Sequence, residues 1–91
     1  LILKMMYKTK VSRKAKKFLE KAPLKTKIRL IKTMKALEKN PFQGKKLGGQ
    51  RQGSYSVRMW PYRIIYEIHK KEILIYIIDI GHRRDIYELK Q

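Results

Sequence analysis

The chain has 91 residues, 43% of them hydrophobic, which suits one small domain with one core. Its 24 lysines and arginines, against 7 aspartates and glutamates, give a formal net charge of +17 at pH 7, so its partners should be nucleic acid, an anionic membrane or an acidic protein. No apolar run reaches the roughly 20 residues of a membrane span, and a chain with no cysteine and two histidines is expected to hold no disulfide, no metal and no cofactor.

The chain opens on a predicted strand. Residues 5–11 alternate, with Met5, Tyr7, Thr9 and Val11 on one face and lysines on the other, which is typical of a half-buried strand. Residues 1–4 are expected to lie outside the fold, with the natural start at Met5 or Met6. The opening is too short and wrongly charged for a signal peptide, so we expect a cytoplasmic protein.

Two helices should follow. Ser12 is a predicted N-cap for a short helix, and Pro23 suits the first turn of a second one that ends at Asn40-Pro41. Apolar residues at helical spacing form one stripe on each helix: Ala15, Phe18, Leu19 and Ala22 on the first, and Leu24, Ile28, Ile31, Met34 and Leu37 on the second.

A basic, glycine-rich connector at residues 44–53 leads into three predicted strands, at about residues 55–60, 62–68 and 73–80. Pro61 and the Lys70-Lys71 pair mark turns short enough for antiparallel hairpins. The last strand is apolar on both faces and should lie centrally. The order β-α-α-β-β-β predicts an α+β fold, a single domain over residues 1–91. Its two N-terminal helices should pack on one face of a four-stranded, mainly antiparallel sheet, with a short C-terminal segment after it.

Strand periodicity separates the side chains of this sheet into two sets. The more apolar sets of the second and third strands should face the helices, so Arg58 and Arg63 point towards the open face of neighbouring strands. Gly81 should end the last strand, so that His82, Arg83 and Tyr87 turn back over the same surface. We therefore predict a cationic cleft under the C-terminal segment.

Each of these residues also has a structural interpretation, since single arginines on basic proteins are usually solvated and lone histidines or terminal tyrosines usually pack. Their convergence favours chemistry at an RNA phosphodiester. There, the 2′-OH attacks phosphorus, arginines neutralise the transition state, and a 2′,3′-cyclic phosphate and a 5′-OH result. Tyr87 and His82 are the two candidates for the general base. Lys45, Lys46, Arg51 and Arg84 are predicted RNA contacts, and Trp60 is a candidate for stacking on a base.

Three stretches are the most specific: Tyr55-Ser56-Val57-Arg58, Tyr62-Arg63-Ile64-Ile65-Tyr66 and Gly81-His82-Arg83-Arg84-Asp85-Ile86-Tyr87. In this order, over nearly the whole chain, they resemble the RelE branch of the RelE/ParE toxin superfamily. The resemblance implies a type II toxin that cuts mRNA in the A site of the 70S ribosome, contacting mRNA and rRNA without a metal. It also implies a RelB-like antitoxin, acidic or amphipathic, that wraps around a toxin otherwise monomeric.

The resemblance also implies residue roles. Arg58 and Arg63 match residues that hold and polarise the phosphate, Arg83 matches an arginine near the leaving group, and Tyr87 matches a proposed general base. Ser56 departs from the pattern, because a lysine is usual there; Lys45, Lys46 or His82 would have to replace that cation.

Three alternatives remain open from the sequence. The chain could be a ParE-like toxin that inhibits DNA gyrase by protein binding, a non-catalytic module that binds RNA or the ribosome, or an inactive toxin.

Overall fold

The computed structural model describes residues 6–88, with side chains to residue 86, so the predictions for residues 1–5 fall outside it. Its helices and strands are largely segregated along the chain, as in an α+β fold, which confirms the predicted class. In chain order they are β1 (Lys8–Val11), α1 (Arg13–Lys21), α2 (Leu24–Lys39), β2 (Lys45–Lys46), β3 (Tyr55–Met59), β4 (Tyr62–His69), β5 (Leu74–His82) and α3 (Arg83–Glu88), with short 3-10 turns at Pro41–Gln43 and Gly49–Arg51.

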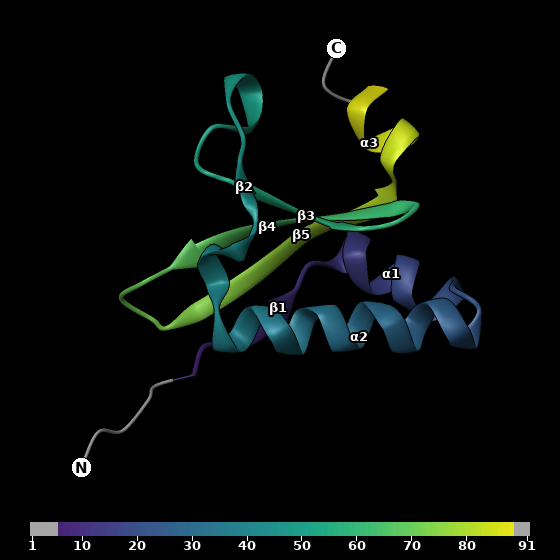
Figure 1. Cartoon of the computed structure of the whole chain (residues 1–91), viewed down its shortest axis with the longest axis horizontal. Helices are drawn as coiled ribbons and strands as arrows, with labels where there is room; N and C mark the ends of the chain where they lie inside the picture. Colours follow the sequence, from purple (N-terminus) through teal and green to yellow (C-terminus); the bar gives the residue numbers. More distant parts are fainter. Residues whose placement is uncertain (1–5, 89–91) are drawn as a thin grey trace.

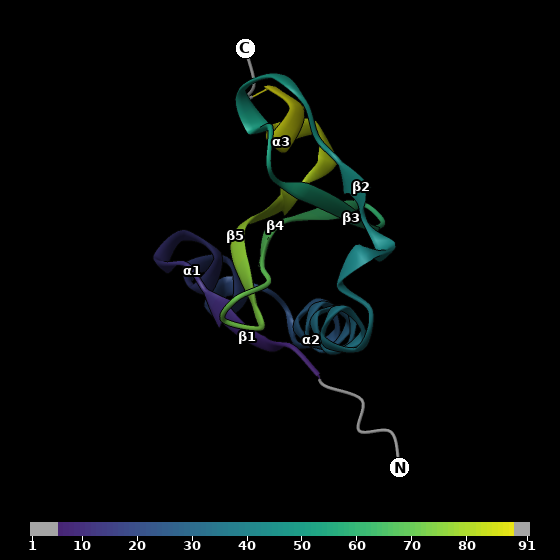
Figure 2. The ribbon, with the colours of Figure 1, turned by 90° about the vertical axis from the view of Figure 1, so that its left-hand side faces the viewer.

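The strands form one mixed sheet in the order β1-β5-β4-β3-β2, in which β1 runs parallel to β5 and the other pairs are antiparallel. The interior position of β5 confirms the prediction from its apolar composition. The sheet has five strands rather than four, because the two-residue strand β2 carries no apolar alternation that would reveal it. Helices α1 and α2 lie on one side of the sheet, and α3 and the connector lie on the other (Figures 1 and 2). Within residues 6–88, no helix combines the length and the apolar character needed to cross a bilayer.

Ser12 caps α1 as predicted and also ties the helix to the sheet. Its hydroxyl oxygen accepts a hydrogen bond from the backbone N–H of Ala15 at 3.1 Å and donates one to the carbonyl of Ile78 at 2.7 Å. One side chain therefore satisfies an otherwise unpaired amide of the first turn and fixes α1 against β5.

The prediction of which α2 residues form the buried stripe is wrong in part. Met34 and Leu37 are buried, but the third buried residue is Leu30, whereas Leu24, Ile28 and Ile31 are 71%, 45% and 40% exposed. Two apolar stripes run along this helix, and the period of the sequence does not say which one meets the sheet. The exposed stripe of Leu24, Ile28 and Ile31 is therefore a surface feature.

A bulge in β5 sets which of its side chains face the helices. Ile65 of β4 pairs with Asp79, but the next residue, Tyr66, pairs with Ile77, so Ile78 is an extra residue in β5. Because a bulge reverses the alternation beyond it, Ile80 joins Ile75 and Ile77 in the core. Asp79 and Gly81 consequently face the open side of the sheet.

The connector is anchored to the sheet by a buried tyrosine. The Tyr66 hydroxyl donates to the carbonyl of Pro41 at 2.8 Å and accepts from the backbone N–H of Gly44 at 3.1 Å. Burial raises the pKa of the Tyr66 phenol, which keeps the hydroxyl protonated and able to donate. This junction fixes where residues 45–53 begin to cross the open face.

We predict that Gly44→Ala lowers the free energy of unfolding by about 1–3 kcal/mol, as overpacking does in well-packed sites. A methyl group on Gly44 would overlap the Tyr66 hydroxyl and approach the carbonyl oxygen of Ser56. Gly48→Ala is the matched control, because a methyl there meets nothing within 4 Å, and should cost less than about 0.5 kcal/mol. Urea denaturation measures both, and equal stabilities would remove the Gly44–Tyr66 junction as a constraint.

Candidate functional site

Arg58 and Arg63 are direct cross-strand partners on β3 and β4. Their neighbours of opposite parity, Met59 and Ile64, are buried in the core, so both arginines project to the open face, as the sequence predicts. Directly opposed side chains have Cβ atoms about 5 Å apart, and like charges there destabilise a sheet. A pair of guanidinium groups held at this spacing is therefore suited to share an anion.

The serine that departs from the family pattern lies beside this pair. Ser56 is 3% exposed, and its hydroxyl accepts a hydrogen bond from Nη1 of Arg63 at 3.2 Å. Ser56 thus contributes no cation but fixes the direction of a half-buried guanidinium. Sequence reasoning treated Ser56 as a loss and missed this role.

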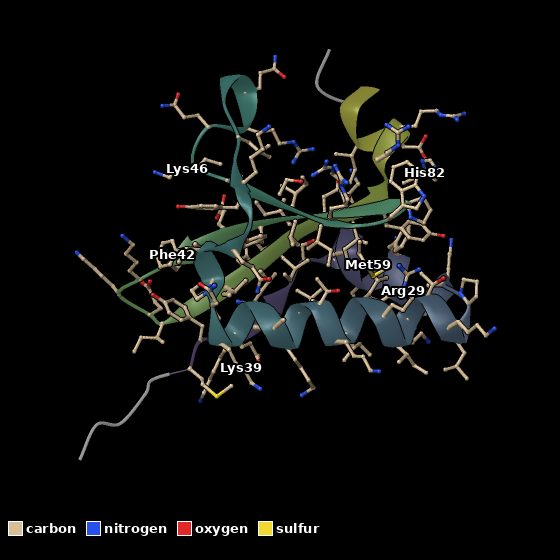
Figure 3. The ribbon with its side chains drawn as sticks, in the orientation of Figure 1. Arg29, Lys39, Phe42, Lys46, Met59 and His82 are labelled. Carbon is tan, nitrogen blue, oxygen red and sulfur yellow. The ribbon has the colours of Figure 1, made fainter. Side chains whose placement is uncertain are left out.

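Lys45 and Lys46, the two lysines of the connector, lie on opposite faces of the sheet. Lys45 pairs with Ser56 and so lies on the open face, whereas Lys46 pairs with Tyr55 and has the opposite parity. Figure 3 shows Lys46 at the outer edge of the sheet, and Met59 and Arg29 between the sheet and α2. Of the predicted replacements for the missing cation, Lys45 is the one that the register places near Arg58 and Arg63.

Arg51 comes from the 3-10 turn in the connector and forms an ion pair with Asp79 of β5, with 3.5 Å between Nη2 and Oδ2. Since Asp79 and Gly81 face the open side, and Gly81 pairs with Arg63, Arg51 reaches the same surface. Asp79 was not predicted as a site residue. Its signal in the sequence is a single carboxylate within an otherwise apolar strand.

Helix α3 is seated on the end of the sheet. A methyl group on Gly81 would come within 3.3 Å of Cγ1 of Ile86, which is 1% exposed, so the bare glycine backbone is what α3 packs on. The backbone N–H of Arg83 donates to the carbonyl of Pro61 at 2.9 Å. These contacts confirm that the C-terminal segment lies over the open face.

The Arg83 side chain reaches the β3–β4 turn. Its guanidinium carbon lies 4.7 Å from the centre of the Trp60 ring, and Trp60 is 56% exposed. From the helix side, Nη2 of Arg29 donates to the Trp60 carbonyl at 2.9 Å. Trp60, in the β3–β4 turn, and Arg83, at the start of α3, are each two residues beyond Arg58 and Gly81 in the chain.

The prediction that Gly81 ends the last strand is wrong, because β5 continues through His82. His82 pairs with Tyr62, and their ring centres are 6.1 Å apart in an edge-to-face contact. The imidazole therefore lies on the opposite face of the sheet from Arg58 and Arg63. Its Nδ1 accepts a hydrogen bond from the backbone N–H of Arg84 at 3.2 Å, and the Arg84 side chain is exposed on α3. Tyr87 belongs to α3, but its side chain is outside the described part.

The surface therefore gathers Arg58, Arg63, Lys45 and Arg51 around Ser56 and Asp79, with Arg83 and Trp60 at one end. Among the side chains described, those of residues 6–86, no three histidines, aspartates or glutamates cluster as metal ligands. The groups present can bind and polarise a phosphate, which is the chemistry that the sequence pattern favoured.

Several solved structures share this fold. The toxin–antitoxin complex RelBE2 from Mycobacterium tuberculosis is 25% identical, with a TM-score of 0.81 over 87% of this chain and 93% of the other. The archaeal RelE–RelB complex from Pyrococcus horikoshii is 29% identical, with a TM-score of 0.73 over 87% and 97%. An arginine-to-alanine double mutant of the Escherichia coli toxin RelE in the free state is 20% identical, with a TM-score of 0.77 over 94% and 95%. These structures define a RelE-like toxin fold.

The family model described as the ParE toxin of type II toxin–antitoxin system, parDE, matches residues 9–87. The chain therefore belongs to this family of toxins, within the RelE/ParE superfamily. No curated protein sequence matches it significantly.

We predict that Arg58→Ala weakens the binding of a short single-stranded oligouridylate. It should also reduce the slope of log affinity against log salt by about 0.7, the value for one lost phosphate contact on a single strand. Lys39→Ala is the control, because Lys39 is exposed on α2, on the other side of the sheet (Figure 3). Fluorescence anisotropy at several salt concentrations measures both, and equal slopes for the two variants would contradict a phosphate contact at Arg58.

Proposed function

We propose that this toxin is a ribosome-dependent endoribonuclease that cuts mRNA in the ribosomal A site and so inhibits translation in the cytoplasm. The observation that carries the proposal is the direct pairing of Arg58 with Arg63 on the open face. A phosphodiester carries the opposite charge and presents two non-bridging oxygens, so two guanidinium groups on neighbouring strands can together hold it. Lys45, Arg51 and Arg84 supply further contacts to the RNA.

The proposed reaction needs no cofactor. The 2′-OH loses its proton to the Tyr87 phenolate and bonds to the adjacent phosphorus, while the bond from phosphorus to the 5′ oxygen breaks and that oxygen takes up a proton from solvent water. Arg58 and Arg63 hold the non-bridging oxygens as their charge grows, and Arg83 stabilises the departing oxygen. The products are a 2′,3′-cyclic phosphate and a 5′-OH.

A phenol can serve as a base at neutral pH only where its phenolate is stabilised by about 4 kcal/mol. Clustered arginines supply a field of the right sign for this. The strand register supports Tyr87 over His82 as the general base, because His82 packs on Tyr62 on the face opposite to the arginine pair.

We predict that Arg83→Ala reduces mRNA cleavage on programmed ribosomes by about 10²- to 10³-fold, the usual loss for one donor to a transition state. The fold should survive, since the Arg83 side chain is exposed and its helix is held by Ile86. Primer extension maps the breaks, with Lys39→Ala as the control for a lost surface charge. Cleavage by folded Arg83→Ala at the wild-type rate would remove Arg83 from the mechanism.

The second candidate is inhibition of DNA gyrase by protein binding, which the match to the ParE model favours. A supercoiling assay separates the two functions: the proposed nuclease leaves gyrase active and cuts mRNA, and a ParE-like inhibitor does the reverse. A protein that binds ribosomes but neither cuts mRNA nor inhibits gyrase would be the non-catalytic module.

We also propose an antitoxin partner, because structures that resemble this chain are toxins in complex with RelB-type antitoxins. The surface that fits it is the exposed stripe of Leu24, Ile28 and Ile31 on α2. The stripe is flanked by exposed lysines (Lys25, Lys32, Lys35 and Lys39), and the one acid of this helix, Glu38, accepts a hydrogen bond from Thr9. An acidic amphipathic segment would cover the stripe and pair with the lysines.

Ile28→Lys should weaken this complex at least about tenfold, because it buries an unpaired charge in an apolar contact. The partner to use is the acidic product of a small reading frame adjacent to the toxin gene, titrated by calorimetry. Ile28→Leu, which keeps the apolar contact, should bind like the wild type. Unchanged affinity of Ile28→Lys would place the antitoxin elsewhere on the toxin.

A further inference from the structure

Asp79 is the one buried carboxylate among residues 6–86, in a chain of net charge +17. It is 3% exposed, on the same side of the sheet as the arginine pair. An acid next to a phosphate-binding surface repels the ligand, so the negative charge has no direct use in holding RNA. A buried carboxylate also needs cationic partners to offset the loss of water.

Its partners come from distant parts of the chain. Oδ2 of Asp79 lies 3.2 Å from Nζ of Lys14 on α1 and 3.5 Å from Nη2 of Arg51 in the connector. The side chain of Lys14 is 64% exposed and that of Arg51 is 20% exposed, so the Arg51 contact is the one shielded from solvent. Neither contact has hydrogen-bond geometry, so both are ion pairs that hold the groups by charge.

The ion pair between Arg51 and Asp79 joins residues 47–53, the part of the connector beyond β2, to β5. The backbone hydrogen bonds described for residues 47–53 stay inside the segment 47–54: Leu47 to Ser54, Arg51 to Gly48, Gln52 to Gly49, and Ser54 to Arg51. Of the hydrogen bonds and ion pairs described there, the Arg51–Asp79 contact is the one that joins the segment to the rest of the fold.

The position of Asp79 connects it to the arginine pair. Asp79 is opposite Ile65, and Gly81, two residues on, is opposite Arg63, so Asp79 and Arg63 are diagonal neighbours on one face. Such neighbours are about 7–8 Å apart. Arg51, drawn in by Asp79, therefore adds a third guanidinium beside Arg58 and Arg63.

We infer that Asp79 is a positioning residue, which holds Arg51 and the connector over the RNA-binding surface and does not itself contact RNA. The inference deepens the proposed function and rests on it for its catalytic consequence. A pure charge effect and a positioning role predict opposite changes in the affinity for a polyanion. Removal of one negative charge should tighten the binding of a polyanion, whereas loss of the Arg51 anchor should weaken binding and slow cleavage.

The test compares Asp79→Asn with Glu72→Gln, which makes the same change in net charge at an exposed residue of the β4–β5 turn. Asp79→Asn should exchange the backbone amides of residues 47–53 about five- to tenfold faster, as expected when a local anchor is lost. Oligouridylate should bind Asp79→Asn more weakly than Glu72→Gln, and mRNA cleavage on ribosomes should fall about tenfold in kcat. Unchanged exchange, or oligouridylate binding as tight as that of Glu72→Gln, would overturn the inference.

Arg51→Ala breaks the same ion pair from the more exposed side and keeps the test decisive if Asp79→Asn does not fold. Arg51→Ala should match Asp79→Asn in amide exchange and in mRNA cleavage. The double variant should lose no more cleavage activity than either single variant, and Arg51→Lys should recover part of the slow exchange and part of the cleavage. Additive losses would mean that the two residues act separately. If the wild type cuts no mRNA, the proposed function fails, but the exchange and oligouridylate measurements still decide the role of Asp79.

Discussion

The open face of this toxin depends on one extra residue in β5. Without the bulge at Ile78, strict alternation would turn Asp79 and Gly81 into the core beside Ile77, and Ile80 and His82 towards the arginines. The core would then receive a carboxylate, and α3 would lose the bare glycine on which Ile86 packs. The bulge therefore fixes the anchor for Arg51, the seat of α3 and the exclusion of His82 from the arginine surface.

The parts of this fold that follow from short-range pattern could be predicted from sequence. The alternation in β3 and β4 is unbroken over the arginine pair, so the open face of Arg58 and Arg63 follows from the period of two. Ser12 as a cap, and β5 as an interior strand, follow in the same way from local residue types.

The rest depends on contacts between distant residues. A bulge within a run of isoleucines has no signal in the sequence. Neither the face on which Asp79 lies nor the continuation of β5 to His82 could therefore be inferred. The pairing that makes β2 a strand joins Lys45 to Ser56, eleven positions apart, with no apolar signal. The choice between the two stripes of α2 likewise depends on which helix face meets the sheet.

Ser56 shows how a missing cation can become difficult to restore. Its buried hydroxyl receives Nη1 of Arg63, so a lysine at this position would remove an acceptor and place an ammonium group against a guanidinium. Ser56→Lys alone would thus be harmful in this background. A lysine at position 56 would be tolerated only together with compensating changes around Arg63.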